Sequence, residues 1–236
     1  MKALRTKICT YAIALFTSLG LATTSAQAGS ADFAGIYGAL NASAGGAQIS
    51  GTHTGGSTNE VNEGKVGGVF PMAGYEVGFN LPLGPYFFLG VGHSWSQSGQ
   101  ASLAESKGDA LGGAGQTGND SAASSSFTLE ASQLKEVYIM PSVSISDGSA
   151  VYAKIGRSIA DLETLGNVTG QPGNLTGDTL GVGTIAMTSS GIFIKTEGSV
   201  TRFEDIQIVG ISGQAGSRID GTPNVVAGTV AIGFKF

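Results

Sequence analysis

The final residues of the chain alternate between two kinds of side chain. Every second residue is apolar or glycine, and the residues between them are small, polar or charged; the first set is Val226, Gly228, Val230, Ile232, Phe234 and Phe236. A period of two places successive side chains on opposite faces of a β-strand. The segment therefore predicts a strand with one wholly apolar face, and this strand ends on a terminal phenylalanine.

Seven further stretches show a similar but weaker alternation. They are residues 33–43, 73–79, 87–95, 136–145, 151–156, 180–187 and 192–201. A single barrel strand gives a weak signal, but eight in succession predict an all-β protein of about eight strands. The facing of the first stretch is ambiguous. Pro71 and Pro141 fall inside proposed strands, where proline removes a ladder donor, and a bulge at either position would change the facing nearby.

Short and long links alternate between these strands. The short links are a Pro/Gly turn at residues 80–85, the Asp147-Gly148 dipeptide and residues 189–191. The long links are rich in Gly, Ser, Asn and Thr, and they cover residues 44–65, 96–130, 161–178 and 204–224. This rhythm is typical of a transmembrane up-and-down antiparallel β-barrel with short periplasmic turns and four long extracellular loops. A secreted soluble β-sandwich is the alternative, although it has no reason to keep the rhythm.

The N-terminus has the three parts of a secretory signal peptide. Lys2, Arg5 and Lys7 form a positive region, residues 8–22 are apolar, and Ala26-Gln27-Ala28 supplies the small-x-small pattern that signal peptidase reads. We therefore expect cleavage after Ala28, so that residues 29–236 form one barrel domain. The apolar run is shorter than the roughly 20 residues of a spanning helix, which argues against a membrane anchor.

Composition narrows the class of protein further. Glycine accounts for 39 of the 236 residues, and only 12% of all residues are charged. This suits a barrel with an apolar lipid face and a polar lumen. The single cysteine, Cys9, would leave with the signal peptide, which excludes disulfides and cysteine metal sites. The same cleavage removes three basic residues and no acidic one, so the net charge falls from −5 to −8, which argues against nucleic acid as a partner.

Strand parity separates the charged residues from the aromatic ones. Opposite the apolar face lie Glu76, Glu136, Lys154, Lys195, Glu197 and Lys235. Eight strands leave an interior just wide enough for side chains, and buried charges must pair. We therefore predict a charge network in the lumen that acts as a polar plug, with a gate for ions or small solutes as the alternative. The same parity predicts outward aromatic girdles at the two interfaces from Tyr75, Phe79, Phe87, Trp95, Phe234 and Phe236.

Two strands and the signal peptide together resemble a known family. The segments Val151-Tyr-Ala-Lys-Ile-Gly-Arg157 and Val230-Ala-Ile-Gly-Phe-Lys-Phe236 are similar to the OmpA-like eight-stranded outer-membrane barrels, often described as porin-family or opacity-type surface proteins. The resemblance covers the mature chain and rests on pattern more than on specific residues. It implies a bacterial outer-membrane location and an assembly signal, made by Val230, Ile232, Phe234 and Phe236, that the barrel-assembly machinery reads. It does not imply one function, because family members support the envelope, adhere to surfaces, display variable loops or show weak pore activity.

Few residues suggest catalysis or cofactor binding. Gly113-Ala-Gly115-Gln-Thr-Gly118 matches a dinucleotide fingerprint only in form, because no βαβ unit surrounds it. The two histidines, His53 and His93, lie in different segments and do not form a metal cluster. Some eight-stranded barrels edit lipid A, but His93 and Ser94 are strand neighbours and point to opposite faces. We expect no enzymatic activity, no cofactor and no metal.

The sequence therefore points to the predicted loops and outer rim as the functional part of the protein. The loops hold many acidic residues and few basic ones, which indicates a solvated surface, with divalent cation binding as the alternative. Lys135, Arg157 and Arg202 fall near the predicted outer rim, where they either contact lipopolysaccharide phosphates or extend to water. The sequence favours a structural or surface-interaction role, with outer-membrane lipids and an extracellular loop ligand as partners. A narrow passive channel is the second hypothesis.

Overall fold

A computed structural model describes residues 29–54, 61–98, 102–105, 127–166, 173–209 and 218–236. The proposed signal peptide, with its cleavage residues Ala26 and Ala28, lies outside the described residues. So does the glycine motif at residues 113–118.

The described chain contains one short 3₁₀ helix and ten strands. These are η1 (Ser30–Phe33), β1 (Gly35–Thr54), β2 (Val61–Pro82), β3 (Phe87–Ser98), β4 (Ser102–Glu105), β5 (Phe127–Ser146), β6 (Ser149–Gly166), β7 (Gly173–Met187), β8 (Ile192–Phe203), β9 (Ile206–Val209) and β10 (Arg218–Lys235). Among the described residues, no helix is long and apolar enough to span a membrane.

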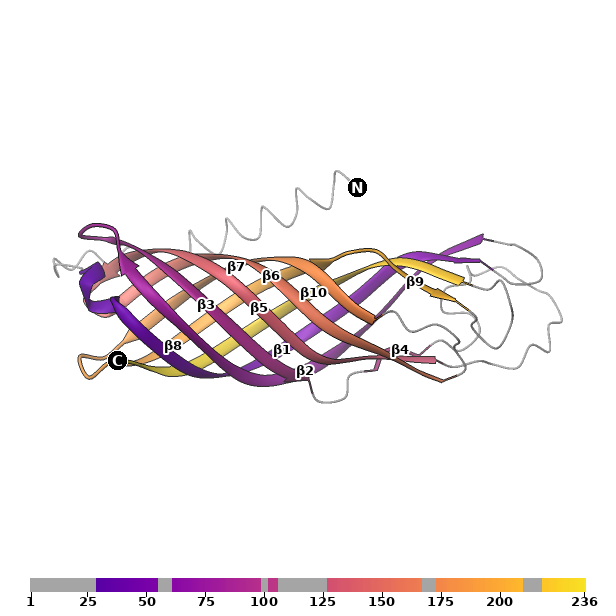
Figure 1. Cartoon of the computed structure of the whole chain (residues 1–236), viewed down its shortest axis with the longest axis horizontal. Helices are drawn as coiled ribbons and strands as arrows, with labels where there is room; N and C mark the ends of the chain where they lie inside the picture. The colour runs from indigo at the N-terminus through magenta and orange to yellow at the C-terminus, as the bar shows by residue number, and fades with distance from the viewer. Residues whose placement is uncertain (1–28, 55–60, 99–101, 106–126, 167–172, 210–217) are drawn as a thin grey trace.

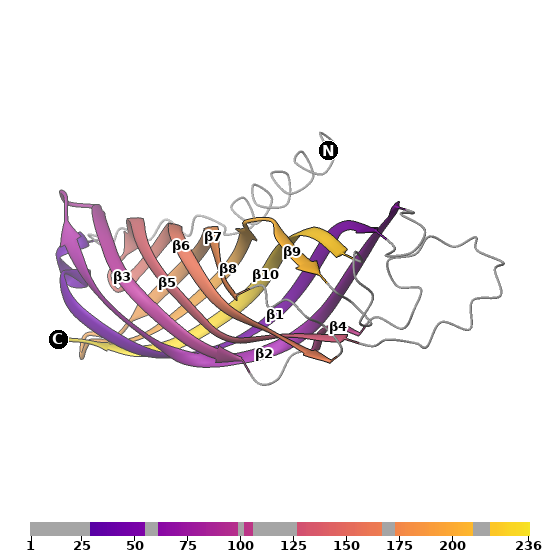
Figure 2. The same ribbon diagram turned by 45° about the vertical axis from the view of Figure 1, so that its right-hand side comes forward.

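The strands form one closed antiparallel barrel. Each long strand pairs with the next along the chain, and β10 pairs with β1 from Tyr37↔Lys235 to Thr54↔Arg218, which closes the ring. The short strands β4 and β9 follow β3 and β8 in sequence and pair with β5 and β10. The ten segments therefore make a barrel of eight strands (Figures 1 and 2), which confirms the predicted fold class.

The three short turns lie at one end of this barrel. They join β2 to β3, β5 to β6 and β7 to β8, and the last two contain Gly148 and Gly191 at φ values of +71° and +86°. Such backbone angles suit glycine because it has no Cβ. In Figure 1 the C-terminus and η1 lie at this same end. By the rule that outer-membrane barrels have short periplasmic turns, this end faces the periplasm.

Neither proline causes a bulge, contrary to the concern that the sequence raised. Pro71 pairs with Ala44 and Pro141 pairs with Leu89, each in an unbroken register. The facing of side chains is the same before and after both residues. The ambiguous first stretch is also resolved, because Phe33 belongs to η1 and β1 begins only at Gly35.

The sequence made the long strands too short at the end of the barrel away from the short turns. β1 runs to Thr54, β6 runs to Gly166, and β10 begins at Arg218, so much of the predicted loops is paired strand. The reason is physical. Beyond the lipid the outer face of each strand meets water, so the apolar-out pattern used to find the strands stops while the hydrogen-bonded ladder continues.

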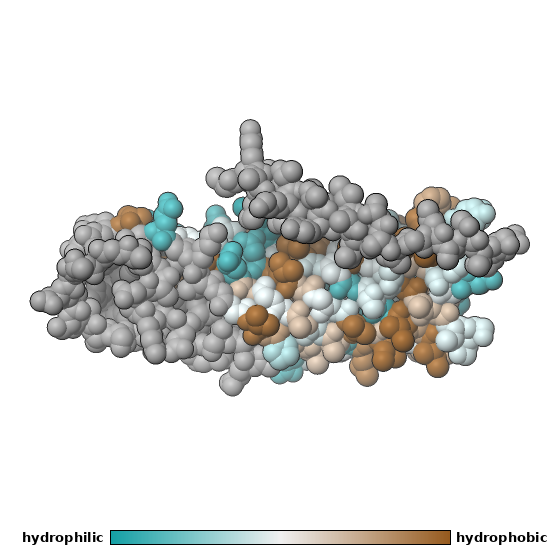
Figure 3. All heavy atoms as spheres, turned by 180° about the vertical axis from the view of Figure 1, so that it is seen from behind, coloured by the Kyte–Doolittle hydropathy of each residue, from teal (hydrophilic) through white to brown (hydrophobic). Residues whose placement is uncertain are grey.

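Polarity reverses along the barrel axis. Near the periplasmic end, exposed apolar residues such as Leu40 (74%) and Ile232 (60%) cover the outside, and charged residues lie inside. Figure 3 shows hydrophobic residues gathered over this part of the wall. Toward the other end the outside becomes more polar, with exposed Gln48, Asp178 and Arg202 beside fewer apolar residues such as Val209, while an apolar cluster fills the inside. A closed barrel with such an apolar belt is a bacterial outer-membrane protein.

We call the part beyond the belt the extracellular stalk. It comprises residues 48–54, 157–166, 173–178, 202–209 and 218–224.

Candidate functional site

Five charged side chains lie together in the middle of the barrel. Lys154 Nζ lies 2.9 Å from Glu136 Oε2 and also pairs with Glu197 Oε1, while Lys195 Nζ pairs with Glu76 Oε2. All five are less than 9% exposed. They come from β2, β5, β6 and β8, so the cluster ties opposite walls of the barrel together. We call these five residues the lumen cluster.

Lys235, the sixth residue assigned to this network, lies apart from the lumen cluster. Its Nζ donates a hydrogen bond of 2.7 Å to the backbone oxygen of Asp32. The inward parity was assigned correctly, but Lys235 is the last residue of β10 and lies at the periplasmic opening. Parity gives the face of a strand and does not give the height along the barrel, which explains the error.

Three buried tyrosines surround the lumen cluster. The Tyr37 and Tyr138 hydroxyls lie 2.9 Å apart, and Tyr138 donates to Glu76 Oε2 at 3.4 Å. Tyr152 donates to Glu197 Oε2 at 3.0 Å. The Tyr138 ring occupies the space over Gly92 on β3, where a Cβ would lie 2.6 Å from ring atoms. Interior glycines of this kind make room for tyrosine rings in a narrow barrel.

Two carboxylate oxygens of the lumen cluster lack a hydrogen-bond partner among the described residues. They are Glu76 Oε1 and Glu136 Oε1. A cavity of about 50 Å³ borders both side chains, and serine and threonine residues line it together with apolar side chains such as Met72 and Leu134. In the same wall, Thr179 Oγ1 lies 2.7 Å from the hydroxyl oxygens of both Ser158 and Thr201. The volume suffices for a few water molecules.

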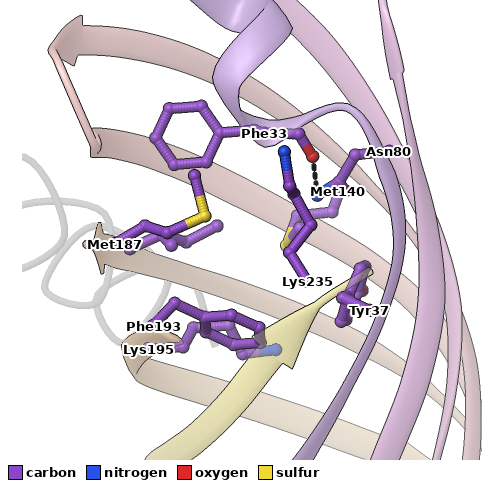
Figure 4. A pocket seen from close by; sticks show the side chains of 9 residues that line it. Phe33, Tyr37, Asn80, Met140, Met187, Phe193, Lys195 and Lys235 are labelled. Atoms are coloured by element: carbon purple, nitrogen blue, oxygen red, sulfur yellow. Dashed lines mark hydrogen bonds between the residues drawn. The ribbon is translucent and has the colours of Figure 1, made fainter. Parts of the chain in front are cut away.

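Packed side chains close the periplasmic end of the barrel. Phe33 of η1 is 1% exposed and stacks on Phe88 with ring centroids 4.9 Å apart. Asn80 Nδ2 donates to the Phe33 backbone oxygen at 3.1 Å, as Figure 4 shows. On the periplasmic side of the lumen cluster, the Tyr37 and Phe193 rings form a T-shaped pair with centroids 5.9 Å apart. The cavity among these residues measures about 20 Å³, which leaves room for no more than about one or two waters.

A second apolar layer closes the extracellular side. Its buried members are Ala47, Ile49, Phe70, Met72, Ala160, Leu175, Phe203, Ile206, Ile208 and Ile219. Most of them come from segments that the sequence assigned to loops. A local signal was present, because Ile206-Gln207-Ile208 and Ala47-Gln48-Ile49 each alternate. It was too short to distinguish from chance in glycine-rich surroundings.

The three basic residues of the predicted rim do lie on the outer wall above the apolar belt. Arg157 Nη1 lies 2.8 Å from Asp178 Oδ1, and its Nη2 lies 2.7 Å from Glu204 Oε1. Lys135 Nζ lies 3.9 Å from Asp161. Arg202, beside Asp178 in the ladder, is exposed.

The histidine and the serine of the lipid A hypothesis do not come together in the structure. The described residues contain no cluster of three or more His, Cys, Asp or Glu side chains suited to a metal ion. Ser94 lines the interior cavity. His93 pairs with Val77 and Val137, whose side chains are exposed on the outer wall. The two residues of the lipid A hypothesis therefore face opposite sides of the wall.

The outward aromatic residues gather mainly toward the periplasmic end. Phe79, Phe87, Phe234 and Phe236 are 42–77% exposed. Tyr75 and Trp95 lie further along the strands, with ring centroids 5.6 Å apart. The four residues of the proposed assembly signal, Val230, Ile232, Phe234 and Phe236, are all exposed on the outer face of the C-terminal segment.

No family model matches the sequence, and no curated protein matches it. Similar solved structures include the attachment invasion locus protein Ail of Yersinia pestis in complex with the heparin analogue sucrose octasulfate, at 11% identity and a TM-score of 0.40, covering 86% of this chain and 99% of that one. The outer membrane protease OmpT of Escherichia coli is similar at 10% identity and a TM-score of 0.39, covering 86% and 97%. The translocator domain of NalP from Neisseria meningitidis reaches 12% identity and a TM-score of 0.31, covering 100% and 97%. The closed ladder of strand pairs, rather than these likenesses, establishes that the chain is an eight-stranded outer-membrane β-barrel.

Proposed function

We propose that the protein is a non-enzymatic barrel that supports the outer membrane and presents a surface for interaction outside the cell. The observation that carries the proposal is the packed interior. One apolar layer lies on each side of the lumen cluster, and the cavities beside the cluster measure about 20 and 50 Å³. A solute channel needs a continuous water-filled path, which these layers interrupt.

The extracellular stalk supplies the interaction surface. Its wall is held by paired strands, such as the ladder from Asn224↔Gln48 to Arg218↔Thr54, and its inside by the apolar layer. A stalk of this kind extends the wall of the barrel beyond the apolar belt. Its exposed wall carries charged residues such as Asp178 and Arg202 together with a few apolar ones such as Ile159 and Val209. This mixed surface suits a soluble ligand or another cell surface better than lipid.

Outer-membrane lipids are the second class of partner. The exposed Arg202 and the partly exposed Lys135 lie where the apolar belt ends, which is the height of lipid phosphates. Contact with lipopolysaccharide phosphates there would be charge-assisted. Because Arg157 already pairs with two carboxylates, Lys135 and Arg202 are the better candidates.

Conductance separates this proposal from the channel hypothesis. The refolded protein in a planar bilayer should show no discrete conductance steps. Steps that change in size when Lys195 or Glu197 is neutralised would refute the proposal and favour a passive channel.

Loop exchange tests the interaction role. Residues 106–126 are replaced by a short Gly/Ser linker, and cells that display the protein are tested for attachment to immobilised extracellular-matrix extract. Attachment should fall while the protein still shows the gel shift of a folded barrel. A matched exchange of residues 167–172 controls for general surface damage. Equal attachment of cells that display the parent protein and of cells without it would argue for a purely structural role.

A further inference from the structure

The turn between β2 and β3 is apolar, unlike the other two turns at the periplasmic end. Residues 81–92 contain no charged side chain, and Leu83 and Tyr86 are 61% and 50% exposed. The β5–β6 turn instead exposes Asp147, and the β7–β8 turn exposes Ser189. An exposed apolar patch of this kind marks a contact with a membrane or with another protein.

Hydrogen bonds within the protein occupy the carbonyl groups of this turn. The four successive carbonyl oxygens of residues 84–87 each accept one. Ser30 of η1 donates to the first two through its hydroxyl and its N–H, and the N–H groups of Ser144 and Leu83 donate to the other two at 2.8 Å each. The two prolines of the turn have no N–H to satisfy. In hydrocarbon each backbone polar group needs a partner inside the protein, so these bonds suit the turn to contact with lipid.

The patch continues the lipid-facing surface of the barrel. Phe79 and Leu81 precede Leu83 at every second position along β2, and they are 43% and 49% exposed. On β3, Phe87 and Val91 are 58% and 45% exposed. Because no charged side chain lies among these residues, the apolar belt and the turn form one surface. The lipid that covers the belt is therefore the partner that this surface fits.

We propose that the β2–β3 turn is inserted into the phospholipid of the periplasmic leaflet of the outer membrane and anchors this side of the barrel there. Leu83 reaches the acyl chains, and the Tyr86 ring lies at the interface, where tyrosine combines an apolar body with a polar hydroxyl group. The two polar turns remain in water. Because Ser30 links η1 to the same turn, the anchor also fixes the η1 seal of the periplasmic opening relative to the membrane. The inference does not depend on the proposed surface role.

Single-tryptophan variants measure the depth of the turn. The chain has one tryptophan, so Trp95→Phe gives a silent background to which Leu83→Trp or Ser189→Trp is added. Residues 29–236 are refolded into phosphatidylcholine vesicles, with or without bromine on the acyl chains, and iodide is added on both sides of the membrane. The Leu83→Trp fluorescence should be quenched by the brominated chains and be several-fold less sensitive to iodide than that of Ser189→Trp. Equal iodide quenching of both reporters, with no effect of bromine on either, would overturn the proposal.

Thiol labelling distinguishes lipid from a bound protein and covers the case in which Leu83→Trp fails to fold. Residues 29–236 contain no cysteine, so Leu83→Cys and Ser189→Cys each carry a single thiol. An impermeant maleimide is added to open fragments of native outer membrane and to both sides of phosphatidylcholine vesicles that hold the refolded protein. Leu83→Cys should react several-fold more slowly than Ser189→Cys in both preparations. Equal reaction rates in the vesicles would overturn the proposal, and protection of Leu83→Cys in native membranes alone would assign the turn to a protein partner instead.

Discussion

Removal of Lys154 should destabilise the barrel more than any surface charge removal. Lys154 holds two buried carboxylates, with Glu136 Oε2 at 2.9 Å and Glu197 Oε1 in direct contact. Lys154→Met keeps a similar length and apolar stem but leaves both carboxylates without their cation. Breaking a buried ion pair from one side costs about 3–5 kcal/mol. This corresponds to roughly two to four orders of magnitude in the folding equilibrium constant.

Equilibrium unfolding in urea, in lipid vesicles, measures this loss. Trp95 is the single tryptophan and lies beside Tyr75 on the outer wall, so its fluorescence reports insertion, and gel mobility reports folding independently. Arg157→Gln, three residues further along β6, is the matched control because Arg157 pairs with two carboxylates on the outside. Its unfolding midpoint should stay close to that of the parent protein.

A triple replacement refines the argument. Lys154→Met combined with Glu136→Gln and Glu197→Gln removes the stranded charges and should recover a large part of the loss. An unfolding midpoint of Lys154→Met equal to that of the parent would refute the view that the cluster is buried and paired.

Three further predictions concern other parts of the barrel. Ile208→Asp places a charge at a position that is 1% exposed in the stalk, so protease added to whole cells should cleave the stalk while the membrane part stays folded. The control Gln207→Lys, on the outer face, should leave the stalk resistant to protease. An Ile208→Asp protein that resists protease would argue against the packed stalk. Deletion of Phe236 should slow recognition by the assembly machinery and lower the amount of folded protein in the outer membrane several-fold. Lys235→Gln should leave that amount unchanged. Equal amounts of the parent protein and both variants in the outer membrane would contradict the proposed assembly signal. His93→Ala should leave lipid A unchanged in mass spectrometry, and a lost modification would make the protein an enzyme.

The membrane part of the fold could be predicted from sequence because two solvents act on each strand. Val230, Ile232 and Phe234 meet lipid while Ala231 and Lys235 face inward, so the alternation is strong where the lipid is. The stalk escaped prediction because its outer face meets water, as at Gln48 and Arg202, and its inner apolar residues are interspersed with glycine. The continuous ladder there depends on pairing between strands that are distant in sequence.

The lumen cluster was only partly predictable. Parity assigned Glu76, Glu136, Lys154, Lys195 and Glu197 to the inner face, where the structure brings them together. Pairing partners and height along the axis depend on the stagger of the strands, which no single strand encodes, and Lys235 was misassigned for that reason.

Gel mobility of the chain from outer-membrane fractions, with and without boiling, tests the central claim most directly. A closed barrel whose walls are tied by a buried charge cluster should resist detergent at room temperature and unfold on boiling. We therefore expect a clear mobility shift together with co-fractionation with the outer membrane. A protein found in the soluble periplasmic or secreted fraction, with the same mobility before and after boiling, would contradict the account.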